Sequence, residues 1–184
     1  DFVPEDDFSI THEMLWNILA YFLKAVVPAA EKHNIKLALH PDDPPVEKLG
    51  GVSRILTSFE NIIRALGVVE SANVGVTMCQ ATYSLMGEDL EMVIPALAKK
   101  NKIFFIHFRD ITGTKYRFRE TFHDNGQTDM AKMLRLYKNC GVHAPIRVDH
   151  VPSMTGEDNN TPGYATVGRL FAVGYLKGLI DAAT

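Results

Sequence analysis

Four short apolar runs in this chain each close on a side chain that can bind a metal ion. They end at His40, Cys79, His107 and Asp149, and a helical pattern follows each of them. Strands that alternate with helices in this way predict a parallel sheet with right-handed crossovers. The carboxyl ends of parallel strands share one edge of the sheet, and neighbouring strands lie about 4.8 Å apart. We therefore expect the four side chains to converge on one ion at that edge.

The spacing of apolar residues predicts the elements along the chain. Ser9 or Thr11 can cap the first helix, and Ser53 can cap the second. The predicted helices are 12–33, 53–67, 89–100, 129–140 and 165–181, and the predicted strands are 35–39, 73–78, 102–107 and 145–149. The remaining long stretches, 80–87, 108–128 and 153–163, are predicted to be loops, and the second is long enough to suggest a functional role.

A helix followed by four βα units amounts to half of a (β/α)8 barrel, so the predicted fold class is α/β. Four parallel strands by themselves would expose two sheet edges, which proteins usually avoid. We therefore expect residues 1–184 to be a single domain that forms the C-terminal half of a TIM barrel, with the N-terminal half absent from this chain. That missing half is then a structural partner.

Composition narrows the class of protein. The 184 residues are 46% hydrophobic, enough for a substantial core, and the net charge of −3 is not clustered by sign. This argues against nucleic-acid and membrane partners. The apolar stretch 14–30 is interrupted by Lys24 and Pro28, so it is not expected to span a membrane. The 2 cysteines give no disulfide framework, which predicts a reduced, cytoplasmic protein.

The predicted ligand set admits more than one metal. Imidazole and carboxylate suit Mn²⁺, Fe²⁺ or Zn²⁺, whereas a thiolate favours Fe²⁺ or Zn²⁺. Four protein ligands would fill all the coordination positions of a tetrahedral zinc ion, which suits a structural role. Asp42 and Asp43 are rival ligands, but the neighbouring prolines indicate a loop-forming role. Each candidate taken alone is more often a structural residue, and the prediction depends on all four occurring together.

Further candidates surround the last strand end. His150 follows Asp149 directly and can act as an acid or base at neutral pH, or can simply hold Asp149 in place. Arg109, His123 and Arg147 are candidate partners for an anionic substrate, since guanidinium groups match carboxylates. They could equally be ordinary solvated or salt-bridged side chains. Tyr164, considered without other information, is expected to be a structural tyrosine in the core or on the surface.

Several motifs together make the chain resemble a known family. The stretches 39–45 (LHPDDPP), 107–110 (HFRD), 147–152 (RVDHVP) and 163–164 (GY) resemble those of mannonate dehydratases of bacterial hexuronate breakdown. The resemblance implies a metal-dependent (β/α)8 barrel related to xylose-isomerase-like sugar enzymes. It also implies a hydro-lyase that converts D-mannonate to 2-dehydro-3-deoxy-D-gluconate in glucuronate catabolism.

Carried over by matching motif, the resemblance implies the metal ligands His40, Cys79, His107 and Asp149. It places His150 and Tyr164 in the acid and base roles, and it implies Mn²⁺ or Fe²⁺ rather than Zn²⁺. We also expect a homo-oligomer, a dimer. Family chains are about twice as long as this one, so activity of this stretch alone is not expected.

Two other functions fit the same residues. A sugar isomerase or epimerase would use the ion to move a proton without losing water. A non-catalytic domain would hold a structural zinc with no open coordination position.

Overall fold

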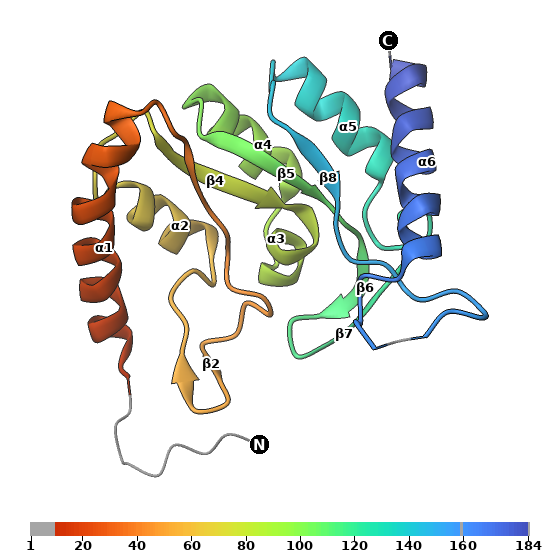
Figure 1. Ribbon diagram of the computed structural model, residues 1–184, viewed down its shortest axis with the longest axis horizontal. Helices are drawn as coiled ribbons and strands as arrows, with labels where there is room; N and C mark the ends of the chain where they lie inside the picture. Colours follow the sequence, from red (N-terminus) through yellow and green to blue (C-terminus); the bar gives the residue numbers. More distant parts are fainter. Residues whose placement is uncertain (1–9, 159, 184) are drawn as a thin grey trace.

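The computed structural model describes residues 10–158 and 160–183, which form a sheet of parallel strands with helices packed against it (Figure 1). The helices are α1 (His12–Lys32), α2 (Phe59–Leu66), α3 (Gln80–Met86), α4 (Leu90–Lys99), α5 (Met130–Asn139) and α6 (Thr166–Ala183). The strands are β1 (Leu37–Leu39), β2 (Lys48–Leu49), β3 (Val52–Ser53), β4 (Val74–Cys79), β5 (Ile103–Phe108), β6 (Ile111–Thr114), β7 (Arg117–Glu120) and β8 (Ile146–Val148).

The main sheet has the order β1-β4-β5-β8, and each neighbouring pair is parallel. At least one helix lies between consecutive strands of this sheet along the chain, and α6 follows β8. Every residue of β4 is buried, as expected for a parallel strand covered on both faces. The predicted α/β class is therefore confirmed.

Helix α1 illustrates how the core is built. The Thr11 side chain accepts a hydrogen bond from a first-turn amide, as predicted, whereas Ser9 lies outside the described residues. Leu23 and Val27 stand one turn apart on the buried face and join a cluster with Ile62 of α2. No described helix, α1 included, carries an apolar stretch that could cross a lipid bilayer.

The predicted start of the second helix at Ser53 is wrong. Ser53 lies in β3, which pairs with β2 as an antiparallel hairpin. Gly50 and Gly51 form the turn with φ angles of 55° and 83°, a conformation that glycine adopts without steric cost. Ser58 is the actual N-cap of α2, and its hydroxyl accepts a hydrogen bond from a first-turn amide.

Regular structure also occupies parts of the predicted loops. Residues 80–87 were expected to be a loop, but α3 begins directly after β4. Most α3 residues are buried, so the helix lacks the polar face that would have indicated it. The predicted loop 108–128 contains the β6–β7 hairpin, where Gly113 has a φ of 125° and packs against the backbone of Arg117.

Gly75 gives a direct test of how closely the main sheet is packed. A Cβ at this position of β4 would lie 2.5 Å from the Lys102 carbonyl oxygen and 2.7 Å from the Phe104 ring. Gly75→Ala is therefore expected to lower the free energy of unfolding by roughly 1–3 kcal/mol, measured by urea denaturation. The matched control is Gly178→Ala in α6, where nothing lies within 4 Å of the added Cβ. Equal stability of the two variants would contradict this packing.

Candidate metal centre and acid–base pair

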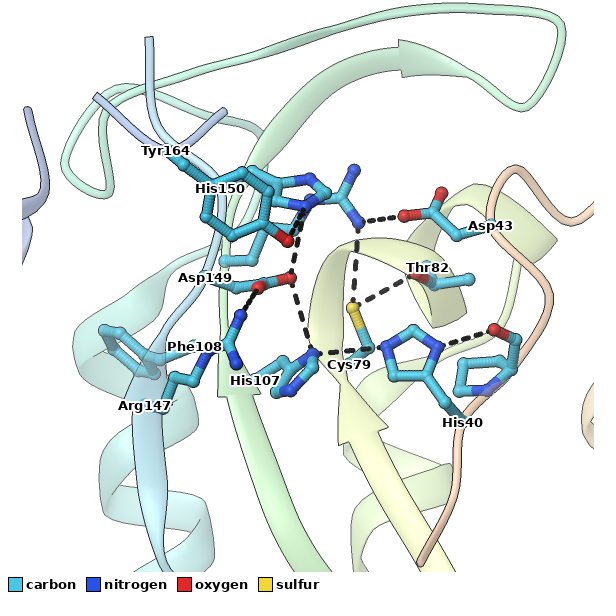
Figure 2. A network of polar contacts seen from close by, with 12 residues as sticks. His40, Asp43, Cys79, Thr82, His107, Phe108, Arg147, Asp149, His150 and Tyr164 are labelled. Carbon is cyan, nitrogen blue, oxygen red and sulfur yellow. Dashed lines mark hydrogen bonds and ion pairs between the residues drawn. The ribbon is translucent and has the colours of Figure 1, made fainter. Parts of the chain in front are cut away.

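The four predicted ligands come from the carboxyl ends of the four strands of the main sheet (Figure 2). His40 directly follows β1, Cys79 is the last residue of β4, His107 lies near the end of β5, and Asp149 directly follows β8. The strand register pairs Cys79 with His107. The parallel pairing thus delivers the four side chains to one edge, as the sequence pattern predicts.

Three of these side chains form a compact group. The candidate ligand atoms of His40, Cys79 and His107 all lie within 4.8 Å of one another, and His40 Nε2 is 3.1 Å from His107 Nδ1. Ring nitrogens and a sulfur that face one another at this distance repel unless a proton or a cation lies among them. Three donor atoms at this spacing can hold a metal ion, and we call His40, Cys79 and His107 the triad.

Local contacts orient the members of the triad. His40 Nδ1 lies 2.7 Å from the carbonyl oxygen of Pro41, which can only accept a hydrogen bond. Nδ1 therefore carries the proton, and the lone pair of Nε2 faces the other members of the triad. The hydroxyl of Thr82 in α3 donates to Cys79 Sγ at 3.1 Å. Outer contacts of this kind are typical of protein metal sites.

Asp149 adjoins the triad through His107. Its Oδ2 lies 3.4 Å from His107 Nδ1, and its Oδ1 accepts a hydrogen bond of 2.8 Å from Arg147 Nη2. Burial alone would raise the pKa of Asp149, but the hydrogen bond and charge of His107 hold it well below its ordinary value. Burial alone would lower the pKa of His107, but Asp149 and Cys79 outweigh it and raise that pKa. The carboxylate is therefore ionised beside the triad.

The chemistry of this donor set fits a divalent transition metal. Two imidazoles, a thiolate and a carboxylate are ligands that Fe²⁺, Zn²⁺ and Mn²⁺ accept in varying preference. The carboxylate also offsets part of the charge of such an ion, which a buried site requires. The donor set does not distinguish these metals from one another.

His150 and Tyr164 form a pair next to Asp149 (Figure 2). His150 Nε2 lies 3.0 Å from Tyr164 Oη and 4.0 Å from Asp149 Oδ2. A parallel bridge between Val151 and Tyr164 holds Tyr164 near the end of β8. Two groups that can exchange protons therefore stand at the border of the candidate metal centre.

Arg109 is linked to this pair through Glu120 and is 1% exposed. Its Nε and Nη2 donate to the two carboxylate oxygens of Glu120, at 2.9 and 2.5 Å, and Nη1 pairs with Asp43. Burial alone would lower the pKa of Arg109, but these acids and Cys79 hold it above its ordinary value. The predicted contact of Arg109 with an anionic substrate stays a prediction, and its guanidinium is already matched by two carboxylates.

Asp42 has the loop-forming role that the prolines indicate. Its Oδ1 pairs with Arg54 at 2.9 Å, and its Oδ2 accepts hydrogen bonds from the amides of Ile55 and Leu56. Asp42 thereby joins the loop after β1 to the segment before α2. Asp43, the next residue, belongs instead to the ion pairs of Arg109.

The two remaining substrate-binding candidates differ in exposure. His123 is fully buried, and its Nε2 lies 2.5 Å from the carbonyl oxygen of Phe108. Burial lowers the pKa of His123, so the ring is neutral near pH 7. The Arg147 side chain is 40% exposed and holds Asp149. Both predicted substrate contacts stay predictions.

Sequence reasoning missed Glu120, Asp43 as a partner of Arg109, and Thr82. Glu120 and Thr82 lie in stretches predicted to be loops. In a loop no periodicity of apolar residues indicates which way a side chain points. For Glu120 a signal existed, because an acid in a long loop with several arginines is a candidate ion-pair partner. The β6–β7 hairpin is what brings it back to the strand ends.

Comparisons with known proteins identify the family of this chain. A model of the D-mannonate dehydratase family (UxuA) matches residues 5–184. The mannonate dehydratase of Streptococcus pneumoniae strain 70585 is 36% identical over 178 residues, covering 95% of this chain and 48% of the relative. Mannonate dehydratase 2 of Halalkalibacterium halodurans is 36% identical over 179 residues, covering 95% and 51%. The chain thus spans about half the length of the curated relatives it matches.

Solved structures support the predicted fold. The crystal structure of mannonate dehydratase from Streptococcus suis serotype 2 superposes with a TM-score of 0.86 at 35% identity, covering 95% of this chain and 50% of that one. L-ribulose 3-epimerase superposes with a TM-score of 0.66 at 17% identity, a likeness of fold alone. The predicted half-barrel is confirmed. Because the family model matches nearly the whole chain, the chain belongs to the D-mannonate dehydratase family.

Proposed function

We propose that the complete protein carrying this chain dehydrates D-mannonate to 2-dehydro-3-deoxy-D-gluconate in glucuronate catabolism. The observation that carries the proposal is the triad of His40, Cys79 and His107 with the His150–Tyr164 pair beside it. Membership of the D-mannonate dehydratase family supports the substrate and the reaction.

We further propose that the triad and Asp149 hold Mn²⁺ or Fe²⁺, with Zn²⁺ less favoured. The contact of Asp149 with His107 supports its place as a fourth ligand. A bound divalent cation supplies Lewis-acid stabilisation of negative charge on substrate oxygens. The proton transfers are carried out by side chains of this chain.

Dehydration of a 2,3-dihydroxy acid needs a base and an acid. The base removes the weakly acidic proton on the carbon beside the carboxylate, and the acid protonates the departing hydroxyl. His150 and Tyr164 supply these roles, and histidine is the better base at neutral pH. Their separation of 3.0 Å supports a shared role, because two groups this close can act on adjacent carbons of one substrate.

Among the substrate-binding candidates we favour Arg147, because its guanidinium is partly exposed beside Asp149. Arg109 and His123 are buried, and their roles toward substrate rest on the sequence pattern. We also propose that the rest of the barrel lies against β1 and β8, each of which has one neighbour in the described sheet. A homodimer and a cytoplasmic location stay predictions from the sequence.

The product of the reaction tests the proposed activity. The complete protein, loaded with Mn²⁺ or Fe²⁺, is expected to convert D-mannonate to a 2-keto-3-deoxy acid, detected by mass spectrometry as the loss of one water. Chelation of the metal should abolish the conversion. A product of unchanged mass would instead indicate an isomerase or epimerase. Tightly held zinc without turnover would indicate a structural site.

Replacing Cys79 tests the metal centre. Cys79→Ser is expected to weaken Mn²⁺ or Fe²⁺ binding by about tenfold or more, because a serine hydroxyl is a poor ligand when neutral. Isothermal titration of the metal-free protein measures the affinity. The matched control is Cys140→Ser at the end of α5, which should bind metal like the parent. Equal loss in both variants, or in neither, would remove Cys79 from the site.

Replacing His150 separates chemistry from metal binding. His150→Asn is expected to lower kcat by roughly 10²–10⁴-fold, the range for loss of a general acid or base. Its metal content should match that of the parent. His143→Asn, an exposed histidine before β8, is the control and should retain full turnover. Unchanged turnover in His150→Asn would exclude this residue from the mechanism.

A further inference from the structure

Glu120 contacts the acid–base pair from the side opposite Tyr164. Its Oε1 lies 3.2 Å from His150 Nδ1, while His150 Nε2 lies 3.0 Å from Tyr164 Oη. Both nitrogens of the imidazole therefore have a partner. Glu120 is the last residue of β7, so the β6–β7 hairpin is what delivers this carboxylate.

The carboxylate of Glu120 is held in its ionised form. Arg109 donates to both of its oxygens in a two-point contact, at 2.9 and 2.5 Å. Burial alone would raise the pKa of Glu120, but the hydrogen bond from His150 and the charge of Arg109 outweigh it and lower that pKa. An ionised carboxylate can only accept hydrogen bonds, so His150 Nδ1 must be the donor between them.

This assignment decides what the other nitrogen can do. A neutral imidazole carries one N–H, and with that proton on Nδ1 the Nε2 atom presents its lone pair. Nε2 faces Tyr164 Oη and also lies 4.0 Å from Asp149 Oδ2, on the side of the candidate metal centre. This lone pair, to which the Tyr164 hydroxyl can donate, is therefore on the side where a substrate would meet the two residues.

The ring is confined from a second direction by Gly163. A Cβ at Gly163 would lie 3.1 Å from His150 Cγ, and the φ of 84° is one that glycine adopts readily. The backbone therefore packs against the face of the imidazole. Contact with Gly163 limits how the ring tilts, but it does not determine which nitrogen carries the proton. The carboxylate of Glu120 lies closer to Nδ1, at 3.2 Å, than the carboxylate of Asp149 lies to Nε2, at 4.0 Å, and so favours the proton on Nδ1.

We propose that Glu120 is a positioning residue, which holds His150 in the Nδ1–H tautomer and so keeps Nε2 unprotonated and able to take the substrate proton. Arg109 in turn holds Glu120 in place, and Asp43 forms an ion pair with Nη1 of the same guanidinium. The inference rests on the proposed function, because the base role of His150 belongs to it. A merely structural Glu120, acting as a counter-ion for Arg109, would leave the His150 tautomer unchanged.

The tautomer can be measured without substrate. The complete protein is labelled with ¹⁵N-histidine, and the His150 resonances are assigned by their loss in His150→Asn. At a pH where the ring is neutral, we expect ¹⁵N shifts of a protonated Nδ1 and an unprotonated Nε2. A proton on Nε2 in the parent protein would overturn the proposal, and this outcome does not depend on the folding of a Glu120 variant.

Glu120→Ala supplies the second readout. Without the carboxylate, His150 is expected to lose its single Nδ1–H form and to show protonated Nε2. In the complete protein kcat should fall roughly 10²-fold, with KM for D-mannonate within a few-fold and metal content unchanged. The matched control is Arg119→Ala, an exposed neighbour on the same strand, which should retain the parent tautomer and kcat.

The outcomes separate the inference from the function that it rests on. A folded Glu120→Ala protein with the parent tautomer and kcat would overturn the role of Glu120. A parent protein that shows the Nδ1–H form, but does not dehydrate D-mannonate, would refute the proposed function and leave the assigned contact intact.

Discussion

The parallel pairing of β1, β4, β5 and β8 is the constraint on which the site depends. Strands that run in one direction bring their carboxyl ends to a common edge, where the chain leaves the sheet and side chains can converge. The pairing of Cys79 with His107 in register places a thiol beside an imidazole without any further contact. His40 and Asp149 extend the same row from the outer strands. A shift of register would disperse the row.

A second layer of charge surrounds that row. Arg109 is buried between Asp43, Glu120 and the sulfur of Cys79, with 3.8 Å between Nη1 and Sγ. A buried guanidinium is costly unless acids surround it, and here the acids come from the loop after β1 and from the β6–β7 hairpin. The guanidinium of Arg109 thus ties together the segments that border the candidate metal centre and the His150–Tyr164 pair. The contacts that satisfy the charge of Arg109 are also those on which the proposed role of Glu120 depends.

The strand ends were predictable because each carries its own signal. An apolar run that closes on His40, Cys79, His107 or Asp149 is visible in the sequence, and the alternation with helices places the four at one edge. The elements that sequence reasoning misplaced are those whose patterns are weak. Helix α3 is buried almost all round, so it lacks a polar face. The β6–β7 hairpin is short, and its strands are only partly covered.

The sequence by itself thus determined the α/β class, the order of the four main-sheet strands with most of the helices, and the side chains offered at the strand ends, because these follow from local periodicity. Only the tertiary structure decided which acid meets which base. The contacts of Glu120 with His150 and of Asp43 with Arg109 join residues 30 and 66 positions apart along the chain. Such pairings depend on how loops close over a sheet, and the free energy that selects them comes from satisfying a buried charge, which no local pattern records.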